Sequence, residues 1–166
     1  MKAVGLFLLI VMACPSCTTN YYVVRHAEKV DNSSDPPLSP AGSRRALALR
    51  DLLRNKHIDS IFSTDFIRTK KTVEPLAADI KKSIHLYTGS VDDAIGELQK
   101  IRGKNVLIAG HSNTVPQLVQ GLSGRSVSAI ADNDFDNLYI IRVRRWIATR
   151  RTLKQVSYGA STPTGN

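Results

Sequence analysis

Apolar and polar residues are arranged along the chain in segments that predict strands alternating with helices. Runs of consecutive apolar residues, such as Tyr21–Val24 and Val106–Ala109, are typical of buried strands. Apolar residues spaced three and four positions apart, such as Leu49, Leu52 and Leu53, predict one apolar face on a helix. The predicted strands span about residues 21–25, 58–62, 84–87, 106–109, 138–143 and 149–158, and the predicted helices span about residues 40–55, 66–82, 92–101 and 114–122.

The order of these elements predicts an α/β fold with three layers. Strands and helices alternate through most of the chain, which favours a mainly parallel sheet with helices on both faces. The last two strands alternate apolar and charged residues, so we expect C-terminal antiparallel strands with one face in solvent. Ser39 and Pro40 are typical of a helix start, and residues 63–65 are suited to cap the next helix. Pro75 predicts a kink or an early end in that helix.

The N-terminal residues have the pattern of an export signal. Lys2 is followed by an apolar run over residues 3–13 and then by Cys14 and Cys17. The apolar run is shorter than the ~20 residues that a membrane-spanning helix needs. Residues 11–14 (VMAC) resemble a bacterial lipobox, in which the cysteine is lipidated and becomes the new N-terminus.

We therefore predict three regions: a lipoprotein signal over residues 1–17, a globular domain over residues 18–158 and a flexible tail over residues 159–166. The predicted location is outside the cytoplasm, with the protein anchored by a lipid in the bacterial envelope, either in the periplasm or at the cell surface. A plain export signal, an uncleaved anchor and cleavage before Cys17 instead of Cys14 are the alternatives.

The composition is that of an ordinary globular protein, with 42% hydrophobic and 22% charged residues, which argues against disorder. Both cysteines lie in the predicted signal region, so the domain has no pair for a disulfide and no cysteine cluster for zinc.

The net charge of +9 favours anionic ligands. Much of the charge is near the C-terminus, where nucleic acid and anionic lipid headgroups are possible partners. A solvated hairpin face explains it more simply, and the few aromatic residues there speak against single-stranded nucleic acid. We thus expect no nucleic acid, and membrane contact only through a lipid at Cys14. The residues concerned are Arg142, Arg144, Arg145, Arg150, Arg151 and Lys154.

Two histidines follow directly on predicted strands. Arg25 and His26 stand at the end of the first strand, and His111 follows Gly110 at the end of the fourth. Ligands of open α/β sheets collect at the carboxyl ends of strands. Two histidines and an arginine in this position therefore indicate a site for an anion.

Four segments together resemble the histidine phosphatase superfamily, which has the phosphoglycerate-mutase-like fold, and in particular its short phosphatase branch. The resemblance covers about residues 21–158. Each segment alone is a weak signal, and their order, spacing and place on the predicted elements make them specific. The segments are Arg25–Lys29, Leu38–Gly42, Ser63–Thr72 and Gly110–Asn113.

The resemblance implies a phosphatase that hydrolyses phosphate monoesters through a phosphohistidine on His26. Arg25, Arg68 and His111 are implied to line the phosphate pocket, with a small phosphorylated substrate and neither cofactor nor metal. The residue types suit the task, because phosphoryl transfer needs positioning and neutralisation of charge, and a guanidinium bonds phosphate through two donors. A neutral imidazole is a competent nucleophile when an acceptor holds its other ring nitrogen.

The proton donor for the leaving group is left open by the sequence. In the mutase-like relatives a carboxyl residue downstream of the second arginine has this role, and position favours the pair Asp92 and Asp93. The same two residues begin a predicted helix, where carboxylates commonly stabilise the helix dipole. The other candidates are Glu97, Glu28, Asp132, Asp134 and Asp136.

Two other functions fit the same residues. One is a phosphohistidine-protein phosphatase, against which the export signal argues, and the other is a non-catalytic module that binds phosphate or polyanions. The chain departs from the family in having Ala27 where glycine is frequent and Ser112 where the acid phosphatase branch has aspartate. It also lacks the long insertions of the mutases, so we expect hydrolysis rather than phosphoglycerate mutation.

Overall fold

The computed structural model describes residues 17–161. The predicted signal segment and Cys14 lie outside this range, whereas Cys17, the last residue of that predicted segment, is the first residue of a strand. Within the described part of the chain, no helix is long and apolar enough to cross a membrane.

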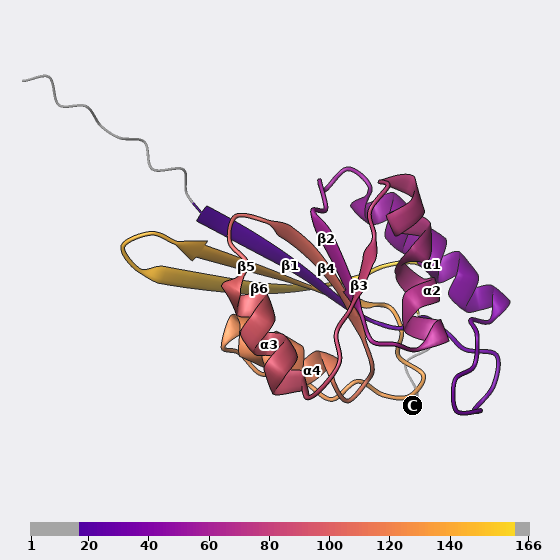
Figure 1. The fold of residues 1–166 in the computed structure, drawn as a ribbon. Coiled ribbons are helices and arrows are strands. Elements are labelled where there is room, and N and C mark those ends of the chain that lie inside the picture. The colour runs from indigo at the N-terminus through magenta and orange to yellow at the C-terminus, as the bar shows by residue number, and fades with distance from the viewer. Residues whose placement is uncertain (1–16, 162–166) are drawn as a thin grey trace, which may run out of the picture.

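Six strands form one sheet in the order β3-β2-β4-β1-β5-β6. The first four strands of the chain run parallel to one another, and β5 and β6 are antiparallel additions at one edge (Figure 1). This arrangement confirms the predicted fold class. The strands are β1 (Cys17–Arg25), β2 (Ser60–Ser63), β3 (Ile84–Leu86), β4 (Asn105–Gly110), β5 (Asn137–Arg145) and β6 (Thr149–Ser157).

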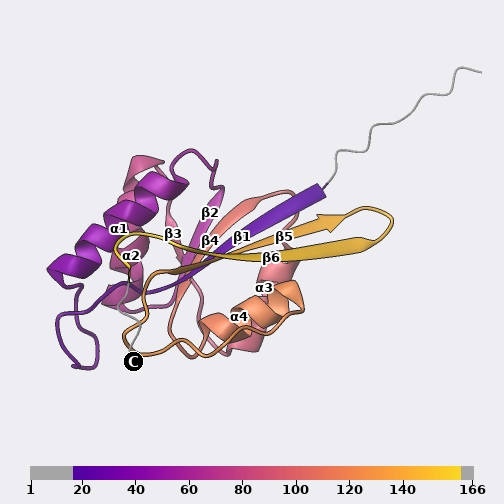
Figure 2. The ribbon, with the colours of Figure 1, turned by 180° about the vertical axis from the view of Figure 1, so that it is seen from behind.

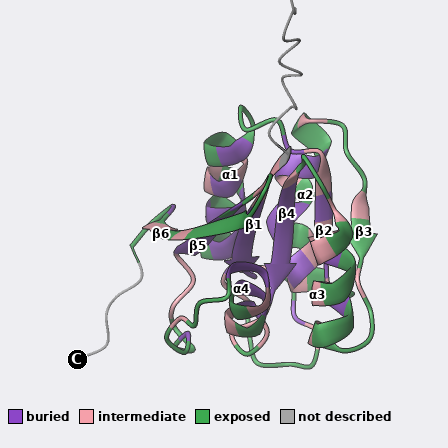
Figure 3. Ribbon diagram, turned by 90° about the vertical axis from the view of Figure 1, so that its left-hand side faces the viewer, coloured by how far each residue is buried: buried purple, intermediate pink, exposed green. Residues whose placement is uncertain are grey.

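Helices cover both faces of the sheet, as Figure 2 shows. Because successive strand residues point to opposite faces, Val24 of β1 packs in the core cluster with α1 and α2, and Val23 packs in the cluster with α3 and α4. The central strands are buried on both sides (Figure 3). The helices are α1 (Pro40–Leu53), α2 (Ile67–Asp79), α3 (Val91–Lys100) and α4 (Val115–Ser123).

The first strand is longer than the apolar pattern predicts. It begins at Cys17 rather than near Tyr21, because residues 17–19 pair with β5 alone, in a part of β1 that is polar. The start of the predicted tail is also held, since the Arg45 guanidinium of α1 donates to the carbonyls of Tyr158 and Ala160 at 2.7 and 2.8 Å.

The second helix differs from the prediction at its start, and it does not end early at its proline. The α2 N-cap is Phe66, which makes no side-chain cap bond, so residues 63–65 do not cap the helix as predicted. The Asp35 carboxylate, from the loop between β1 and α1, instead accepts from the Ile67 N–H at 2.8 Å. The helix continues past Pro75, because Leu76 is buried and its carbonyl still accepts from the Ile80 N–H at 3.0 Å.

The topology brings two strand ends together. Strands β1 and β4 are parallel neighbours in which Arg25 pairs with Gly110, so the residues that follow them leave the sheet at the same edge. The His26 N–H donates to the Gly110 carbonyl at 2.8 Å. The residues after both strands therefore share one end of the molecule.

Candidate active site

The two strand-end histidines lie against each other at the carboxyl edge of the sheet. The ring centroids of His26 and His111 are 5.4 Å apart, and the ring planes are inclined at 63° to each other. Gly110 precedes the second ring, and a Cβ at this position would lie 2.9 Å from the Thr114 hydroxyl. That hydroxyl accepts from the His111 N–H, so the glycine allows the strand to turn tightly into the start of α4.

The hydrogen bonds of His26 define its tautomer. Its Nδ1 lies 2.8 Å from the Ala27 carbonyl oxygen, and because a carbonyl only accepts, Nδ1 carries the proton. Nε2 then holds the free lone pair. Burial, together with the charges of Arg25 and Arg68 and despite the bond to Ala27, lowers the pKa of His26 to about 4. The imidazole is therefore neutral and nucleophilic at pH 7.

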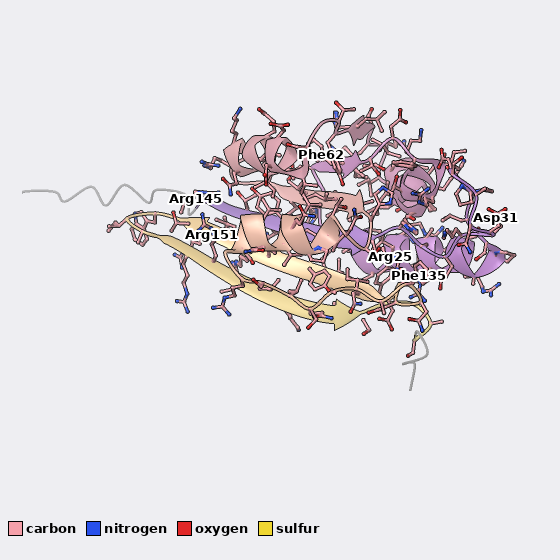
Figure 4. All side chains as sticks on the ribbon, turned by 90° about the horizontal axis from the view of Figure 1, so that it is seen from below. Arg25, Asp31, Phe62, Phe135, Arg145 and Arg151 are labelled. Carbon is pink, nitrogen blue, oxygen red and sulfur yellow. The ribbon has the colours of Figure 1, made fainter. Side chains whose placement is uncertain are left out.

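Arg25 is a buried cation held by one end. Its Nη1 donates to the carbonyls of Ala131 and Asp134 at 2.7 and 3.0 Å, in the loop between α4 and β5. The guanidinium carbon lies 4.2 Å from the ring centroid of Phe135, and Figure 4 shows the two side chains at the same end of the sheet. Its buried Nε has no hydrogen-bond partner among the described residues. A donor of this kind is suited to an anionic oxygen.

The second arginine comes from the first turn of α2. Arg68 approaches Asp35 at 3.5 Å and lies over the Phe66 ring at 4.3 Å, which together orient the guanidinium. Its Nη2 lies 3.5 Å from Nδ1 of His111, and Nε2 of that histidine is 3.0 Å from the Thr64 hydroxyl. Burial, then Arg68 and Arg25, lower the pKa of His111 to about 4. Both histidines are therefore neutral before an anion binds.

Two further contacts fix the backbone around His26. The Thr72 hydroxyl of α2 accepts from the Ala27 N–H at 2.8 Å and donates to the Arg68 carbonyl at 2.7 Å. One threonine thus connects the segments that carry the first histidine and the second arginine. The alanine at position 27 is fully buried and has no positive φ, so it takes the place of glycine without strain.

The segment Leu38–Gly42 contacts the backbone that follows His26. The Ser39 hydroxyl caps α1 by accepting from the Gly42 N–H at 3.1 Å, and the Ser39 N–H donates to the Glu28 carbonyl at 2.9 Å. A Cβ at Gly42 would collide with that same carbonyl oxygen. The start of α1 therefore packs directly against the backbone that follows His26.

These residues surround a pocket of about 440 Å³. Within residues 17–161, no group of three or more His, Cys, Asp or Glu side chains is arranged to hold a metal ion. The four predicted site residues all line the pocket, together with a further cation, Lys29, and one acidic residue, Asp132. The lining residues are Arg25, His26, Lys29, Phe66, Arg68, His111, Ser112, Asn113, Thr114 and Asp132.

Among the acidic candidates, only Asp132 lines this pocket. The carboxylate of Glu28 is engaged by Arg45 at 2.8 Å. Asp93 completes a capping box with Ser90 at the start of α3, and Asp92 lies beside it in that first turn. Neither member of this pair lines the pocket, and the alternative of helix capping describes Asp93. The spacing along the sequence does not reveal that the loop before β5 folds back over Arg25.

Residues that the sequence did not single out complete the site. Phe66 and Phe135 cover the two guanidiniums, and Asp35 and Thr64 orient Arg68 and His111. Phe66 stands two positions before Arg68, which is a local signal. Thr64 stands four positions before Arg68 in the same segment, whereas Asp35 and Phe135 come from loops that are distant in sequence, so no local pattern points to those two.

One protein family is similar to the first half of the described chain. The model of the histidine phosphatase superfamily (branch 1) matches residues 21–89. No match was found among curated proteins. The family match confirms the resemblance seen in the sequence.

Solved structures of low sequence identity share the fold. A mycobacterial glucosyl-3-phosphoglycerate phosphatase superposes with a TM-score of 0.67 at 14% identity, covering 82% of this chain and 97% of its own. The putative phosphohistidine phosphatase SixA of Nakamurella multipartitia gives 0.60 at 18% identity, with 87% and 96% covered. A phosphoserine phosphatase of Entamoeba histolytica gives 0.61 at 14% identity, with 86% and 98% covered. The chain thus has the fold of the histidine phosphatases.

Proposed function

We propose that this protein is a phosphomonoesterase that works through a phosphohistidine on His26. One observation carries the proposal. The Ala27 carbonyl holds the proton on Nδ1, which leaves the Nε2 lone pair of a neutral His26 in a pocket flanked by Arg25, Arg68 and His111. The family match and the phosphatases among the structural relatives support a reaction of this class.

In the first step, Nε2 of His26 attacks phosphorus and the bond from phosphorus to the ester oxygen breaks. The two arginines neutralise charge on the equatorial oxygens, where phosphoryl transfer needs it. A bound dianion also raises the pKa of His111, because an opposite charge favours the imidazolium. In the second step, water attacks phosphorus, the P–N bond breaks, and phosphate and free His26 are released.

Asp132 is the proton donor in this proposal. The carbonyls of Ala131, directly before it, and of Asp134, two residues after it, both accept from Arg25, so the loop holds the carboxyl group at the pocket. The carboxylic acid gives its proton to the leaving alkoxide, and the carboxylate then takes a proton from the attacking water. The same group thus serves both steps.

We further propose that the enzyme is exported and anchored by a lipid at Cys14. Support for this comes from the order of Lys2, the apolar run and the VMAC motif in the sequence. The protein would then meet small phosphate esters in the bacterial envelope. Lipid labelling of cells, with Cys14→Ser as the control, tests the anchor.

A phosphohistidine on another protein is the second candidate substrate. It is favoured by the structural similarity to a putative phosphohistidine phosphatase. That protein is 18% identical to this chain, whereas the other two neighbours described above are each 14% identical. Turnover of a phosphohistidine-carrying protein faster than of any small ester would establish this substrate in place of the first.

The nucleophile is tested by His26→Ala, with turnover of an aryl phosphate as the measurement. We expect turnover to be lost, because no other ring nitrogen in the pocket is held in the attacking tautomer. His85→Ala is the matched control, since this exposed histidine lies outside the pocket. Acid-labile label from a ³²P-substrate should appear on the wild type and not on the variant. Unchanged turnover in His26→Ala, or phosphate binding without turnover of any ester, would overturn the proposal.

The proton donor is tested by comparing Asp132→Asn with Asp92→Asn. Loss of a general acid costs about 10²- to 10⁴-fold in rate, and we expect this loss only in Asp132→Asn. The loss should be large for alkyl phosphates and small for p-nitrophenyl phosphate, because nitrophenolate leaves without a proton. An equal loss for both esters would show that Asp132 has only a structural role.

A further inference from the structure

The hairpin of β5 and β6 ends in two exposed apolar residues. Trp146 is 69% exposed and Ile147 is 94% exposed, the largest values among the exposed large hydrophobic residues of the described chain. Both stand in the turn, where the Trp146 N–H donates to the Ala148 carbonyl at 3.3 Å. A tryptophan beside an aliphatic residue on a protruding tip is typical of side chains at a membrane interface.

Directly behind this tip lies a face of unpaired cations, which we call the basic hairpin face: Arg142, Arg144 and Arg150. Arg144 and Arg150 are opposite each other across the two strands, although like charges in this position destabilise a hairpin. With Thr152, opposite Arg142, they line a hollow of about 230 Å³. None of the three has an ion pair with a described acidic residue. An arrangement that costs stability and leaves the charges uncompensated suits an anionic ligand.

The start of the domain lies beside the same tip. Cys17, the first residue of β1, pairs with Arg145, the last residue of β5 before the turn. Cys14 is three positions earlier in the sequence, so its Cα lies at most about 11 Å from that of Cys17. A lipid on Cys14 would therefore enter the bilayer next to Trp146 and Ile147.

The pocket with His26 is at the opposite end of β1. From Cys17 to Arg25 the strand advances by eight residues, or about 26 Å. Figure 4 shows the same separation, with Arg145 and Arg151 near the hairpin tip and Arg25 and Phe135 at the other end. A surface bound at the tip leaves the pocket free.

From these observations we propose that the hairpin tip docks on an anionic lipid bilayer. Trp146 and Ile147 enter the interface, and the basic hairpin face binds the phosphate groups of the lipid heads. Basic residues near a lipid anchor add electrostatic binding to anionic lipids. The hairpin would thus fix the orientation of a tethered enzyme, with its pocket directed away from the membrane. This role goes beyond the proposed catalytic function and does not depend on it.

Nucleic acid is the competing polyanion. An exposed aliphatic side chain such as Ile147 makes no stacking contact with a base. The hairpin tip has one aromatic ring, Trp146, whereas proteins that bind single strands use several stacking platforms. The apolar tip and the position of Cys17 therefore favour the lipid surface.

Trp146 is the one tryptophan in the sequence, so its fluorescence reports on the tip alone. The full chain is mixed with phosphatidylcholine vesicles prepared with and without phosphatidylglycerol. On the anionic vesicles we expect a blue shift of the emission and quenching by brominated lipids, both reduced by salt. Emission unchanged from that in buffer on both kinds of vesicle would overturn the proposal.

The arginines are tested with the triple variant Arg142→Gln, Arg144→Gln and Arg150→Gln. Each cation near an anionic surface strengthens docking about fivefold, so the docking equilibrium should fall on the order of a hundredfold and the blue shift should disappear. The variant removes a like-charge pair, so its melting temperature should not fall. A blue shift that survives in it would contradict the role of the basic hairpin face.

The matched control removes three cations from the pocket end of the molecule, with Arg44→Gln, Lys70→Gln and Lys71→Gln, and should keep the blue shift. If it loses the shift as the triple variant does, net charge rather than the hairpin drives binding, and the proposal fails. A change in Trp146 emission with a single-stranded oligonucleotide, and none with anionic vesicles, would also overturn the proposal. It would identify nucleic acid as the ligand.

Discussion

At the scale of single residues, the site depends on histidines kept neutral among arginines. His26 is 4% exposed, and desolvation disfavours its charged form more strongly than the bond to Ala27 favours it. Hydrogen bonds to two carbonyls and a cation–π contact with an aromatic ring offset the desolvation cost of burying Arg25. The positive charge of the pocket therefore comes from its guanidiniums and from Lys29, and its imidazoles remain available as nucleophile and as hydrogen-bond partner.

The neutral histidines predict activity that persists into acid. Because the pKa of His26 is lowered to about 4, the free lone pair is present above that pH and is lost as the pH falls through it. The pH profile of kcat/KM reports groups of the free enzyme, so its acid limb should have an apparent pKa near 4, shared with His111. Measurement with an aryl phosphate between acid and neutral pH checks this. An acid limb near the ordinary histidine value of about 6.5 would contradict it.

At the scale of elements, the sequence predicts what depends on local pattern and misses what depends on distant contacts. The ends of β1 and β4, and the Ser39 cap of α1, follow from apolar runs and turn chemistry, and the structure confirms them. The cap of α2 is different, because Asp35 reaches it from a loop far earlier in the chain. The position of Asp132 likewise depends on carbonyls that bind Arg25, which no spacing along the chain encodes.

Alanine is expected to have opposite effects at two helical glycines, Gly42 in α1 and Gly96 in α3. Gly42→Ala would place a Cβ against the Glu28 carbonyl, a backbone atom that cannot move cheaply, so we expect a loss of about 1–3 kcal/mol in unfolding free energy. Gly96→Ala, in the interior of α3, meets no atom within 4 Å and should gain about 0.5–1 kcal/mol.

Urea denaturation of the two variants measures both free energies. The Gly42 variant should also lose turnover, because Glu28 is two residues from His26, whereas the Gly96 variant should keep it. A Gly42→Ala protein as stable as the wild type would show that α1 can shift away from the strand exit at no cost.

At the scale of the whole molecule, β1 connects two ends with different tasks. Its carboxyl end delivers Arg25 and His26 to the pocket, and its amino end lies beside the hairpin tip, where we propose a lipid anchor. Both ends carry a feature that stability alone does not explain: buried imidazoles among guanidiniums at one, and opposed arginines behind an apolar tip at the other. Function therefore costs stability at both ends, and the core of the parallel strands offsets this cost.

The cost at the pocket end is measurable as a pH dependence of global stability. The folded pKa of His26 and of His111 is lowered to about 4, below the unfolded value of about 6.5, so between these pH values the unfolded chain binds more protons. The unfolding free energy should therefore fall as the pH drops from 6.5 toward 4, by up to about 3 kcal/mol for each histidine. Carboxylates with lowered pKa, such as Glu28, act at lower pH, so the upper part of this window isolates the histidines. Urea denaturation across the window measures the slope of the unfolding free energy against pH. This slope should be shallower for His26→Asn than for the wild type and unchanged for His85→Asn. A wild-type slope of zero would contradict neutral histidines in the pocket.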